Sequence, residues 1–274
     1  MSGAAGAPGG VRLVATDLDG TVVRRDGTIS PRTRAAFDAC REAGVRVVAV
    51  TGRPPRWVVD LADLFGPVVV VCANGAITFD LATRSVMGSH TVPPAAVLEA
   101  VPAVRRELPG VSAALETLAG FRHEPAYVPR FDARRTAVVG ELPELLSDDP
   151  GVVKLLLRED STPSDRLLDV VQRAAGHLVE PTHSGMDGLV EVSARGVSKA
   201  SALAELAGGL GIDAADVAAF GDMPNDLPML RWAGHSYAVG GGHPDVLAAA
   251  DRVTPPCEED GVAQVLERLL QLTP

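Results

Sequence analysis

Short valine-rich runs separated by amphipathic segments constrain the fold more than any other feature of the chain. Residues 11–16, 45–50 and 68–72 are apolar along nearly their whole length, and strands that read this way are buried on both faces of a sheet. The segments between them have helical patterns, and the first begins at Ser30-Pro31, a capping serine followed by a first-turn proline. Strands and helices in alternation predict a parallel sheet covered on both faces.

The same alternation returns after about residue 190. The later pattern predicts three helices and two strands, at residues 198–210, 225–232 and 259–272, and at 217–220 and 237–239. Residues 84–189 carry more prolines and no regular alternation. We therefore predict a doubly wound Rossmann-like α/β core formed by residues 11–83 and 190–274, an inserted α/β domain at 84–189, and a loose tail at 1–10.

Composition excludes several kinds of partner. The 274 residues carry 35 acidic and 25 basic side chains, a formal charge of −10, which makes a nucleic acid a poor partner. No apolar run approaches the roughly 20 residues that span a bilayer, and we see no secretory leader. Three widely spaced cysteines suit neither a disulfide framework nor a zinc site. We expect a cytoplasmic protein, monomeric or homodimeric, without a membrane partner.

A pair of carboxylates follows the first predicted strand. Asp17 and Asp19 lie two residues apart in the stretch DLDGT, so on extended backbone both side chains point the same way. Gly20 lets the chain turn away behind them. An EF-hand loop is excluded, because Val22 occupies the sixth position where that motif needs glycine. An acidic turn without function is the alternative for this stretch taken alone.

Four further polar features follow, or lie beside, predicted core strands. They are Thr51 in VTGR, Asn74-Gly75 after the third strand, Lys199 at a helix start behind Ser198, and Asp222, Asn225 and Asp226 in GDMPND. Each has an ordinary structural explanation when taken alone, as a cap, a turn or a surface charge. Ligands of open parallel sheets bind beyond the carboxyl ends of the strands, so these groups should gather at one edge. Carboxylates, a hydroxyl and a lysine together predict a site for Mg²⁺ and phosphate.

With these motifs in order, the chain resembles the haloacid dehalogenase superfamily of phosphohydrolases, most closely its Cof-type branch with a large C2 (type IIB) cap. The DxDGT motif is matched from Asp17 to Thr21, the second motif by Thr51, the lysine motif by Gly196 to Lys199, and GDxxND by Gly221 to Asp226. The similarity runs from about residue 11 to 272. One departure is Gly240-Gly241-Gly242, where the branch commonly has Gly-Asn-Ala.

The resemblance implies a role for each matched residue. Asp17 is expected to be the nucleophile that forms an aspartyl-phosphate, and Asp19 the acid and base. Magnesium is expected on the Asp17 carboxylate, the Asp19 main-chain carbonyl and Asp222. The phosphate-binding set is Thr51, Gly52, Lys199 and Asn225, where Asn225 contacts phosphate or Asp17. Asp226 is expected to orient Lys199 or a metal-bound water.

The resemblance further implies a Mg²⁺-dependent phosphatase for a small phosphorylated metabolite, such as a sugar phosphate or a flavin or pyridoxal precursor phosphate. The inserted domain is expected to select the leaving group. Candidate specificity residues are Arg53, Asn74, Gly75, Arg122, His183 and Asp187. Other interpretations are a sugar phosphomutase of the same superfamily, a response-regulator receiver, and an inactive phospholigand sensor. The long insertion argues against a receiver, and the filled catalytic positions argue against a sensor.

Overall fold

A computed structural model describes residues 10–61, 68–129, 136–149, 151–185 and 187–271. The chain divides into two compact units. We call residues 1–88 and 199–274 the core unit, and residues 89–198 the inserted unit. An α/β core interrupted by a second α/β unit is the predicted fold class, and it is confirmed. The expected tail falls almost wholly outside the described residues.

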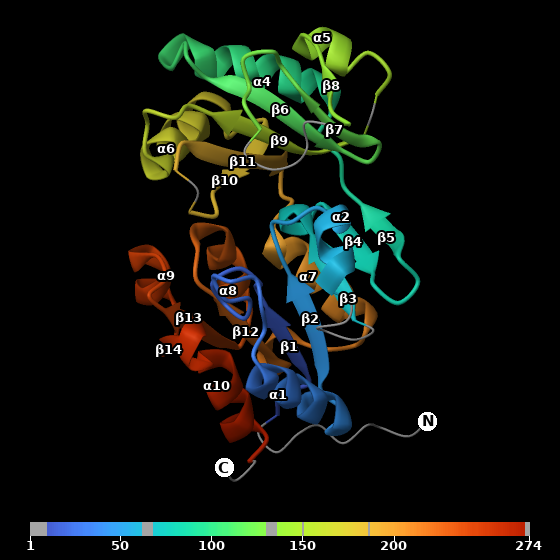
Figure 1. Cartoon of the computed structure of the whole chain (residues 1–274), viewed down its shortest axis with the longest axis vertical. Helices are drawn as coiled ribbons and strands as arrows, with labels where there is room; N and C mark the ends of the chain where they lie inside the picture. Colours follow the sequence, from blue (N-terminus) through green and yellow to red (C-terminus); the bar gives the residue numbers. More distant parts are fainter. Residues whose placement is uncertain (1–9, 62–67, 130–135, 150, 186, 272–274) are drawn as a thin grey trace. The chain divides into compact units, whose positions relative to one another are not determined.

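The core unit is built on one sheet of eight strands (Figure 1). They are β1 (Leu13–Thr16), β2 (Arg46–Val50), β3 (Val69–Cys72), β4 (Ile77–Asp80), β5 (Ser85–Ser89), β12 (Val217–Gly221), β13 (His235–Gly240) and β14 (Arg252–Pro256). Their spatial order is β14-β13-β12-β1-β2-β3-β4-β5. Neighbouring strands from β14 to β3 pair in parallel, and β4 returns antiparallel to β3. The central position of β1 therefore places the residue after it at the middle of the sheet edge.

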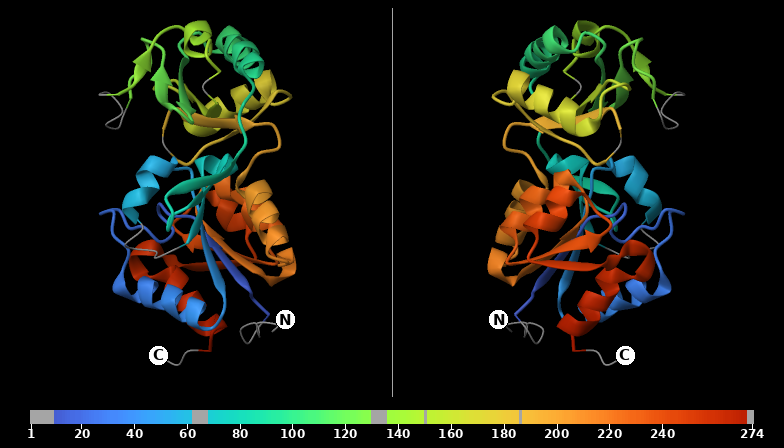
Figure 2. Two further views of the ribbon diagram at one scale, coloured as in Figure 1. Left: turned by 90° about the vertical axis from the view of Figure 1, so that its right-hand side faces the viewer. Right: turned by 90° about the vertical axis from the view of Figure 1, so that its left-hand side faces the viewer.

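Helices cover both faces of this sheet. They are α1 (Pro31–Glu42), α2 (Pro55–Val58), α7 (Lys199–Gly209), α8 (Leu227–Trp232), α9 (Pro244–Ala249) and α10 (Gly261–Leu269), with short 3-10 helices η1 (Val59–Leu61), η2 (Ala73–Gly75), η4 (Ala214–Asp216), η5 (Pro224–Asp226) and η6 (Cys257–Glu259). Figure 2 shows α1 and α10 on one face, and α7 and α8 on the other. Leu13 and Ala15 of β1 pack toward α7 and α8, in a cluster that includes Leu203 and Met229.

Local sequence explains where these helices begin and end. Ser30 caps α1 by accepting a hydrogen bond from the Thr33 N–H at 3.0 Å, and the chain leaves the helix at Gly44, which has a φ of 76°. The helical segment expected between the strands at residues 45–50 and 68–72 is α2 followed by η1 in the described residues. Burial of the apolar strands and capping of the helices thus determine where each strand ends.

The inserted unit is a six-stranded sheet with helices on one face. Its strands are β6 (Ser112–Thr117), β7 (Gly120–His123), β8 (Val138–Val139), β9 (Val152–Arg158), β10 (Val179–Thr182) and β11 (Leu189–Ala194), and its helices are α4 (Pro94–Glu107), α5 (Leu142–Leu145) and α6 (Ser164–Ala175). The strand order is β10-β11-β9-β6-β7-β8, antiparallel except for the β7–β8 pair. A core of aliphatic side chains joins this sheet to α4 and α6, and it includes Val101, Leu157, Leu167 and Val190.

The boundaries of the inserted unit lie at other residues than the sequence pattern suggested. The expected limits were residues 84 and 189, whereas the inserted unit spans Ser89–Ser198. Strand β5 belongs to the edge of the core sheet, so the first boundary falls after it. Strand β11 pairs with β9 and β10 in the inserted sheet, so the second boundary falls just before α7. Strand pairing, which sequence patterns do not reveal, accounts for both differences.

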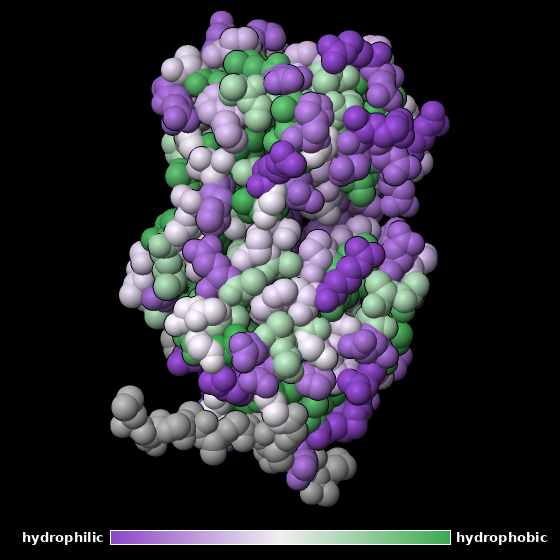
Figure 3. All heavy atoms as spheres, turned by 180° about the vertical axis from the view of Figure 1, so that it is seen from behind, coloured by the Kyte–Doolittle hydropathy of each residue, from purple (hydrophilic) through white to green (hydrophobic). Residues whose placement is uncertain are grey.

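Polar and apolar residues are mixed over the surface. On the face shown in Figure 3, hydrophilic and hydrophobic residues are interspersed on both units. Large exposed apolar side chains come from separate elements, such as Val86 on β5, Leu98 on α4 and Val253 on β14. Among the described residues, every helix is too short or too polar to cross a membrane.

Candidate active site

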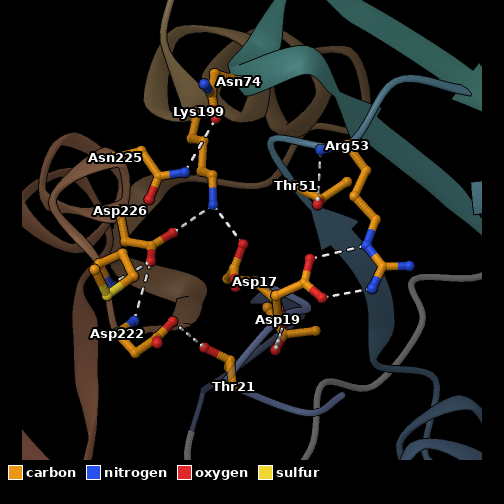
Figure 4. Close-up of polar contacts among 12 residues, drawn as sticks. Asp17, Asp19, Thr21, Thr51, Arg53, Asn74, Lys199, Asp222, Asn225 and Asp226 are labelled. Carbon is orange, nitrogen blue, oxygen red and sulfur yellow. Dashed lines mark hydrogen bonds and ion pairs between the residues drawn. The ribbon is translucent and has the colours of Figure 1, made fainter. Parts of the chain in front are cut away.

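The carboxyl ends of the central strands bring the polar motifs together, as the parallel sheet predicts. Asp17 follows β1, Thr51 follows β2 and Asp222 follows β12, while Asn74 lies in η2 directly after β3. The Asp17 N–H donates to the carbonyl of Phe220 at 2.9 Å, which continues the β1–β12 pairing into the site. Figure 4 shows these side chains around one centre, together with Lys199 from the start of α7.

Lys199 occupies the middle of the site. Its Nζ lies 2.5 Å from Asp17 Oδ1 and 2.7 Å from Asp226 Oδ1, and its side chain is 0% exposed (Figure 4). The second oxygen of Asp226, Oδ2, accepts the backbone N–H groups of Asp222 and Met223, both at 3.0 Å. Asp226 therefore connects the loop after β12 to Lys199. This is one of the two contacts that the sequence analysis left open for Asp226.

Burial and the charges of neighbouring groups together shift the pKa values of these side chains. Burial, with repulsion from Asp226 and Asp222, raises the pKa of Asp17 well above its usual range, and Lys199 opposes the rise. Burial and Asp226 raise the pKa of Asp222 to about 7, while a hydrogen bond from Thr21 opposes them. Burial alone would lower the pKa of Lys199, but Asp17 and Asp226 outweigh it and raise that pKa. Lys199 is therefore charged at neutral pH.

The turn after β1 fits closely against Asp222. Gly20 has a φ of 79°, and a Cβ at this position would lie 2.5 Å from Asp222 Oδ2. Thr21 donates its hydroxyl to Asp222 Oδ1 at 3.0 Å. Any larger residue at position 20 would push Asp222 away from Asp17, so glycine is required both by the backbone conformation and by the space.

The acidic cluster fits a divalent cation. Asp17, Asp222 and Asp226 each offer an oxygen within 4.8 Å of the others. When ionised, the three carboxylates exceed the single ammonium of Lys199 by two negative charges. Asp226 is already engaged through both oxygens, so Asp17 and Asp222 are the side chains with capacity for a metal. Hard carboxylate oxygens are the donors that Mg²⁺ prefers.

Asp19 faces a different partner. Arg53 binds the Asp19 carboxylate with both arms of its guanidinium, Nε to Oδ2 at 2.8 Å and Nη2 to Oδ1 at 2.5 Å. The Arg53 backbone N–H also donates to Thr51 Oγ1 at 3.1 Å, which leaves the hydroxyl hydrogen of Thr51 available to another acceptor. Gly52 lies between the two residues. The sequence indicated Arg53 as a specificity residue but gave no sign of this pair, which spans 34 positions.

Asn225 and Asn74 meet across the site. The Nδ2 group of Asn225, in η5, donates to Asn74 Oδ1 at 3.1 Å, and both residues are buried (Figure 4). Gly75 completes η2 with a φ of 104°. The sequence analysis placed Asn74 and Gly75 among residues for substrate selection, whereas the structure shows Asn74 bound to a residue of the predicted phosphate set.

The triple glycine stands beside Asp222. The carbonyl of Asp222 accepts the His243 N–H at 2.7 Å, and a Cβ on Gly242 would lie 2.6 Å from that carbonyl oxygen. Glycine at 242 therefore permits a backbone approach that alanine, the usual residue in the Cof branch, would not allow without a shift. Gly241 has a φ of 87°, in the left-handed region that favours glycine.

The three specificity candidates of the inserted unit occupy separate elements. Arg122, on β7, binds Asp148 with both guanidinium arms and the carbonyl of Leu145. His183 follows β10, and its Nε2 lies 2.8 Å from Asp165 Oδ1. Asp187 is exposed in the turn before β11. Arg122 and His183 thus already have protein partners.

The inserted sheet has a polar face that sequence reasoning missed. Opposite the face that packs on α4 and α6, cross-strand pairs place Glu116 beside Lys154 and Ala114 beside His123. Lys154 Nζ lies 2.5 Å from Glu191 Oε1, with both side chains almost fully buried. Lys154 and Arg158 are four residues apart in VVKLLLR, and Glu191 and Ser193 are two residues apart. Even spacings place polar side chains on one face of a strand, so this pattern could have indicated the face.

Three rings lie beside these charges. The centroids of Phe121, His123 and Tyr127 are separated by 5.9 to 6.2 Å, in tilted arrangements. Phe121 and His123 come from β7 and pair in register with Glu116 and Ala114. The face therefore combines flat aromatic rings with a buried ion pair. Such a combination suits a ligand that has both a ring and polar groups.

Comparison with known proteins agrees with this fold. The family model of haloacid dehalogenase-like hydrolases matches residues 14–266, so the chain belongs to that family and is an enzyme of the hydrolase class. Among its relatives is the 5-amino-6-(5-phospho-D-ribitylamino)uracil phosphatase YitU of Bacillus subtilis. The two sequences are 31% identical over 271 residues, 95% of this chain and 98% of the relative.

Solved structures share the fold over nearly the whole length. SMU.1108c from Streptococcus mutans superposes with a TM-score of 0.82 at 20% identity, covering 95% of this chain and 99% of the other. The subclass IIB sugar phosphatase BT4131 superposes with a TM-score of 0.77 at 23% identity, covering 94% and 98%. At these identities the likeness establishes the fold, a core with an inserted cap, which is the fold of the Cof-type branch.

The acidic cluster predicts how stability depends on pH and metal. Raised pKa values mean that the folded metal-free protein holds protons more tightly than the unfolded chain, so its stability should fall as the pH rises from about 5 to about 8. Mg²⁺ should raise the melting temperature strongly at about pH 8 and little at about pH 5. Thermal unfolding in EDTA and in Mg²⁺ measures this.

Two other kinds of pKa shift do not affect the stability between about pH 5 and about pH 8. Surface carboxyls with lowered pKa, such as Asp80 and Asp251, change stability only in more acidic solution, and Lys199 only in strongly alkaline solution.

Asp222→Asn should remove most of the Mg²⁺ effect, whereas the control Asp216→Asn, at an exposed ion pair with Arg12, should keep it. An equal Mg²⁺ effect at both pH values would contradict the assignment.

Proposed function

We propose that the protein is a Mg²⁺-dependent phosphatase that hydrolyses a small phosphorylated metabolite through an aspartyl-phosphate on Asp17. The observation that carries this proposal is the position of Asp17. It stands at the centre of the sheet edge, and its Oδ1 is held by a fully buried lysine. A buried ammonium beside a carboxylate forms a place where a phosphate dianion can approach a nucleophile of like charge.

In the first step, Asp17 attacks the phosphorus atom. Lys199 holds Oδ1, so Oδ2 is the oxygen that forms the new bond to phosphorus while the ester P–O bond breaks. Asp19 gives its proton to the departing oxygen. The Thr51 hydroxyl, the Gly52 N–H and the Asn225 amide bind the phosphoryl oxygens, and Lys199 reduces the repulsion between the carboxylate and the dianion.

A metal ion completes the charge balance. Asp17, Asp222 and the main-chain carbonyl of Asp19 would hold Mg²⁺, which supplies positive charge against the phosphoryl group. Thr21 and Gly20 keep Asp222 beside Asp17 for this purpose.

In the second step, Asp19 takes a proton from water as the water oxygen bonds to phosphorus. The Asp17–phosphorus bond breaks and inorganic phosphate leaves. Arg53 binds both carboxylate oxygens of Asp19 in the structure. Arg53 must release or shift along that carboxylate before Asp19 acts as the acid of the first step.

The relatives narrow the substrate class. Relatives named as phosphatases of 5-amino-6-(5-phospho-D-ribitylamino)uracil occur in both Bacillus subtilis and Escherichia coli. This compound joins a ring to a phosphorylated polyol, and the polar face of the inserted sheet offers rings beside a charged pair. We therefore propose a flavin-precursor phosphate of this kind as the substrate, with a sugar phosphate as the alternative.

The first test uses the two aspartates of the DLDGT turn. Asp17→Asn should abolish phosphate release from p-nitrophenyl phosphate, because an amide is a poor nucleophile and a weaker metal ligand. Asp19→Asn should be nearly inactive but should still bind Mg²⁺, since its proposed metal contact is the main chain. Phosphate release and calorimetric Mg²⁺ binding measure both, with the exposed Asp38→Asn as control. Substantial turnover by Asp17→Asn would exclude the covalent mechanism.

A second test examines the polar face of the inserted sheet. Glu191→Gln and Phe121→Leu should each lower kcat/KM about tenfold for the ribitylaminouracil phosphate, the loss expected for one polar or ring contact. Turnover of acetyl phosphate, which has no ring or polyol, should change little. Glu107→Gln removes an exposed pair with Arg173 in the same unit and serves as control. Equal losses on both substrates would show that the face is structural.

A further inference from the structure

The turn after β3 has an unusual backbone. Ala73, Asn74 and Gly75 have φ values of 50°, 56° and 104°, three successive residues in the left-handed region. Asparagine and glycine tolerate this region, but alanine is strained there. Such a run persists only where the surrounding contacts enforce it, and it often marks a functional site.

Backbone hydrogen bonds from this turn hold the loop after β2. The Ala73 N–H donates to the carbonyl of Arg53 at 2.9 Å, and the Asn74 N–H donates to the carbonyl of Thr51 at 3.0 Å. Thr51 thereby gains a fixed position at the site, with its hydroxyl accepting the Arg53 N–H. The left-handed conformation of the turn directs these two N–H groups toward one loop.

The side chain of Asn74 makes a second connection, to a segment 151 residues away. Asn74 Oδ1 accepts Asn225 Nδ2 at 3.1 Å, and the two residues are 2% and 5% exposed. Asn225 Oδ1 is buried and has no hydrogen-bond partner within the described part of the chain. An amide free to rotate would satisfy a buried oxygen. The hydrogen bond that Asn225 Nδ2 donates to Asn74 Oδ1 holds the amide of Asn225 in this orientation.

We propose that Asn74 is a positioning residue that fixes the amide of Asn225 so that its second N–H points to the phosphoryl oxygens. A primary amide carries two N–H groups at one end and an oxygen at the other. By accepting one N–H, Asn74 determines which end of the amide a bound anion meets. Rotation by half a turn would present the oxygen of Asn225, which repels a phosphoryl oxygen. The same turn positions Thr51, so one strained segment sets two anion-binding groups.

This inference rests on the proposed phosphate site, and a double-mutant cycle tests it in the full-length protein. Asn74→Gly deletes the side chain and keeps the left-handed backbone accessible, so the contact is separated from the turn. Asn225→Ala removes the amide, and the double variant removes both. Arg84→Gly, at another left-handed residue in the turn between β4 and β5, is the matched control.

The measurement is calorimetric binding of inorganic phosphate in the presence of Mg²⁺, together with KM and kcat for p-nitrophenyl phosphate. Asn74→Gly should weaken phosphate binding about tenfold, the loss of one charge-assisted hydrogen bond, and should raise KM more than it lowers kcat. The double variant should bind phosphate no more weakly than Asn225→Ala alone. Arg84→Gly should bind like the parent.

Two results would overturn the proposal while the phosphate site stands: unchanged phosphate binding by Asn74→Gly, or losses that multiply in the double variant. A folding defect would lower the melting temperature, and it would lower kcat by the same factor as it raises KM. This pattern would also count against a positioning role. If the parent protein neither binds phosphate nor hydrolyses p-nitrophenyl phosphate, the proposed function fails and this inference fails with it.

Discussion

A single buried ammonium holds this site together. Lys199 is fully buried between Asp17 and Asp226, and its ammonium forms an ion pair with each of them. A buried charge without partners is very costly, and removing one member of such a cluster leaves the others uncompensated. The close approach of Asp17, Asp222 and Asp226 therefore depends on Lys199, and so does the path of the loop after β12, whose N–H groups bind Asp226.

The sheet makes that arrangement possible. Asp17 and Lys199 are 182 positions apart. The parallel order of β12, β1 and β2 places Asp17 at the middle of one edge of the sheet, and the packing of α7 on the sheet brings its first residue, Lys199, to the same edge. The residues that support this close approach are small or have strained backbones. Gly20 allows contact with Asp222, and the left-handed Ala73 lets the turn after β3 bind the loop after β2. The left-handed conformation of Ala73 persists because these hydrogen bonds hold the turn in place.

Much of this could be predicted from the sequence because it follows from local patterns. Apolar runs gave the strands, Ser30 gave a helix start, and the rule for parallel sheets placed Asp17, Thr51 and Asp222 together. Contacts between side chains far apart in the sequence could not be predicted, because they depend on three-dimensional distances. The pairs Arg53–Asp19 and Asn225–Asn74 are of this kind, as is Lys154–Glu191. The boundaries of the insertion differed because β5 and β11 resemble any other strand until their pairing is known.

The central claim is that Asp17 forms a covalent bond to phosphorus, and chemical trapping measures it most directly. Asp19→Asn should slow the removal of the phosphoryl group from Asp17, whereas p-nitrophenolate leaves from phosphorus with little help from an acid. Acid quenching of this variant with radiolabelled p-nitrophenyl phosphate, followed by peptide mapping, should place the label on the peptide that contains Asp17. Release of p-nitrophenol without label on that peptide, or with label on another peptide, would contradict the account.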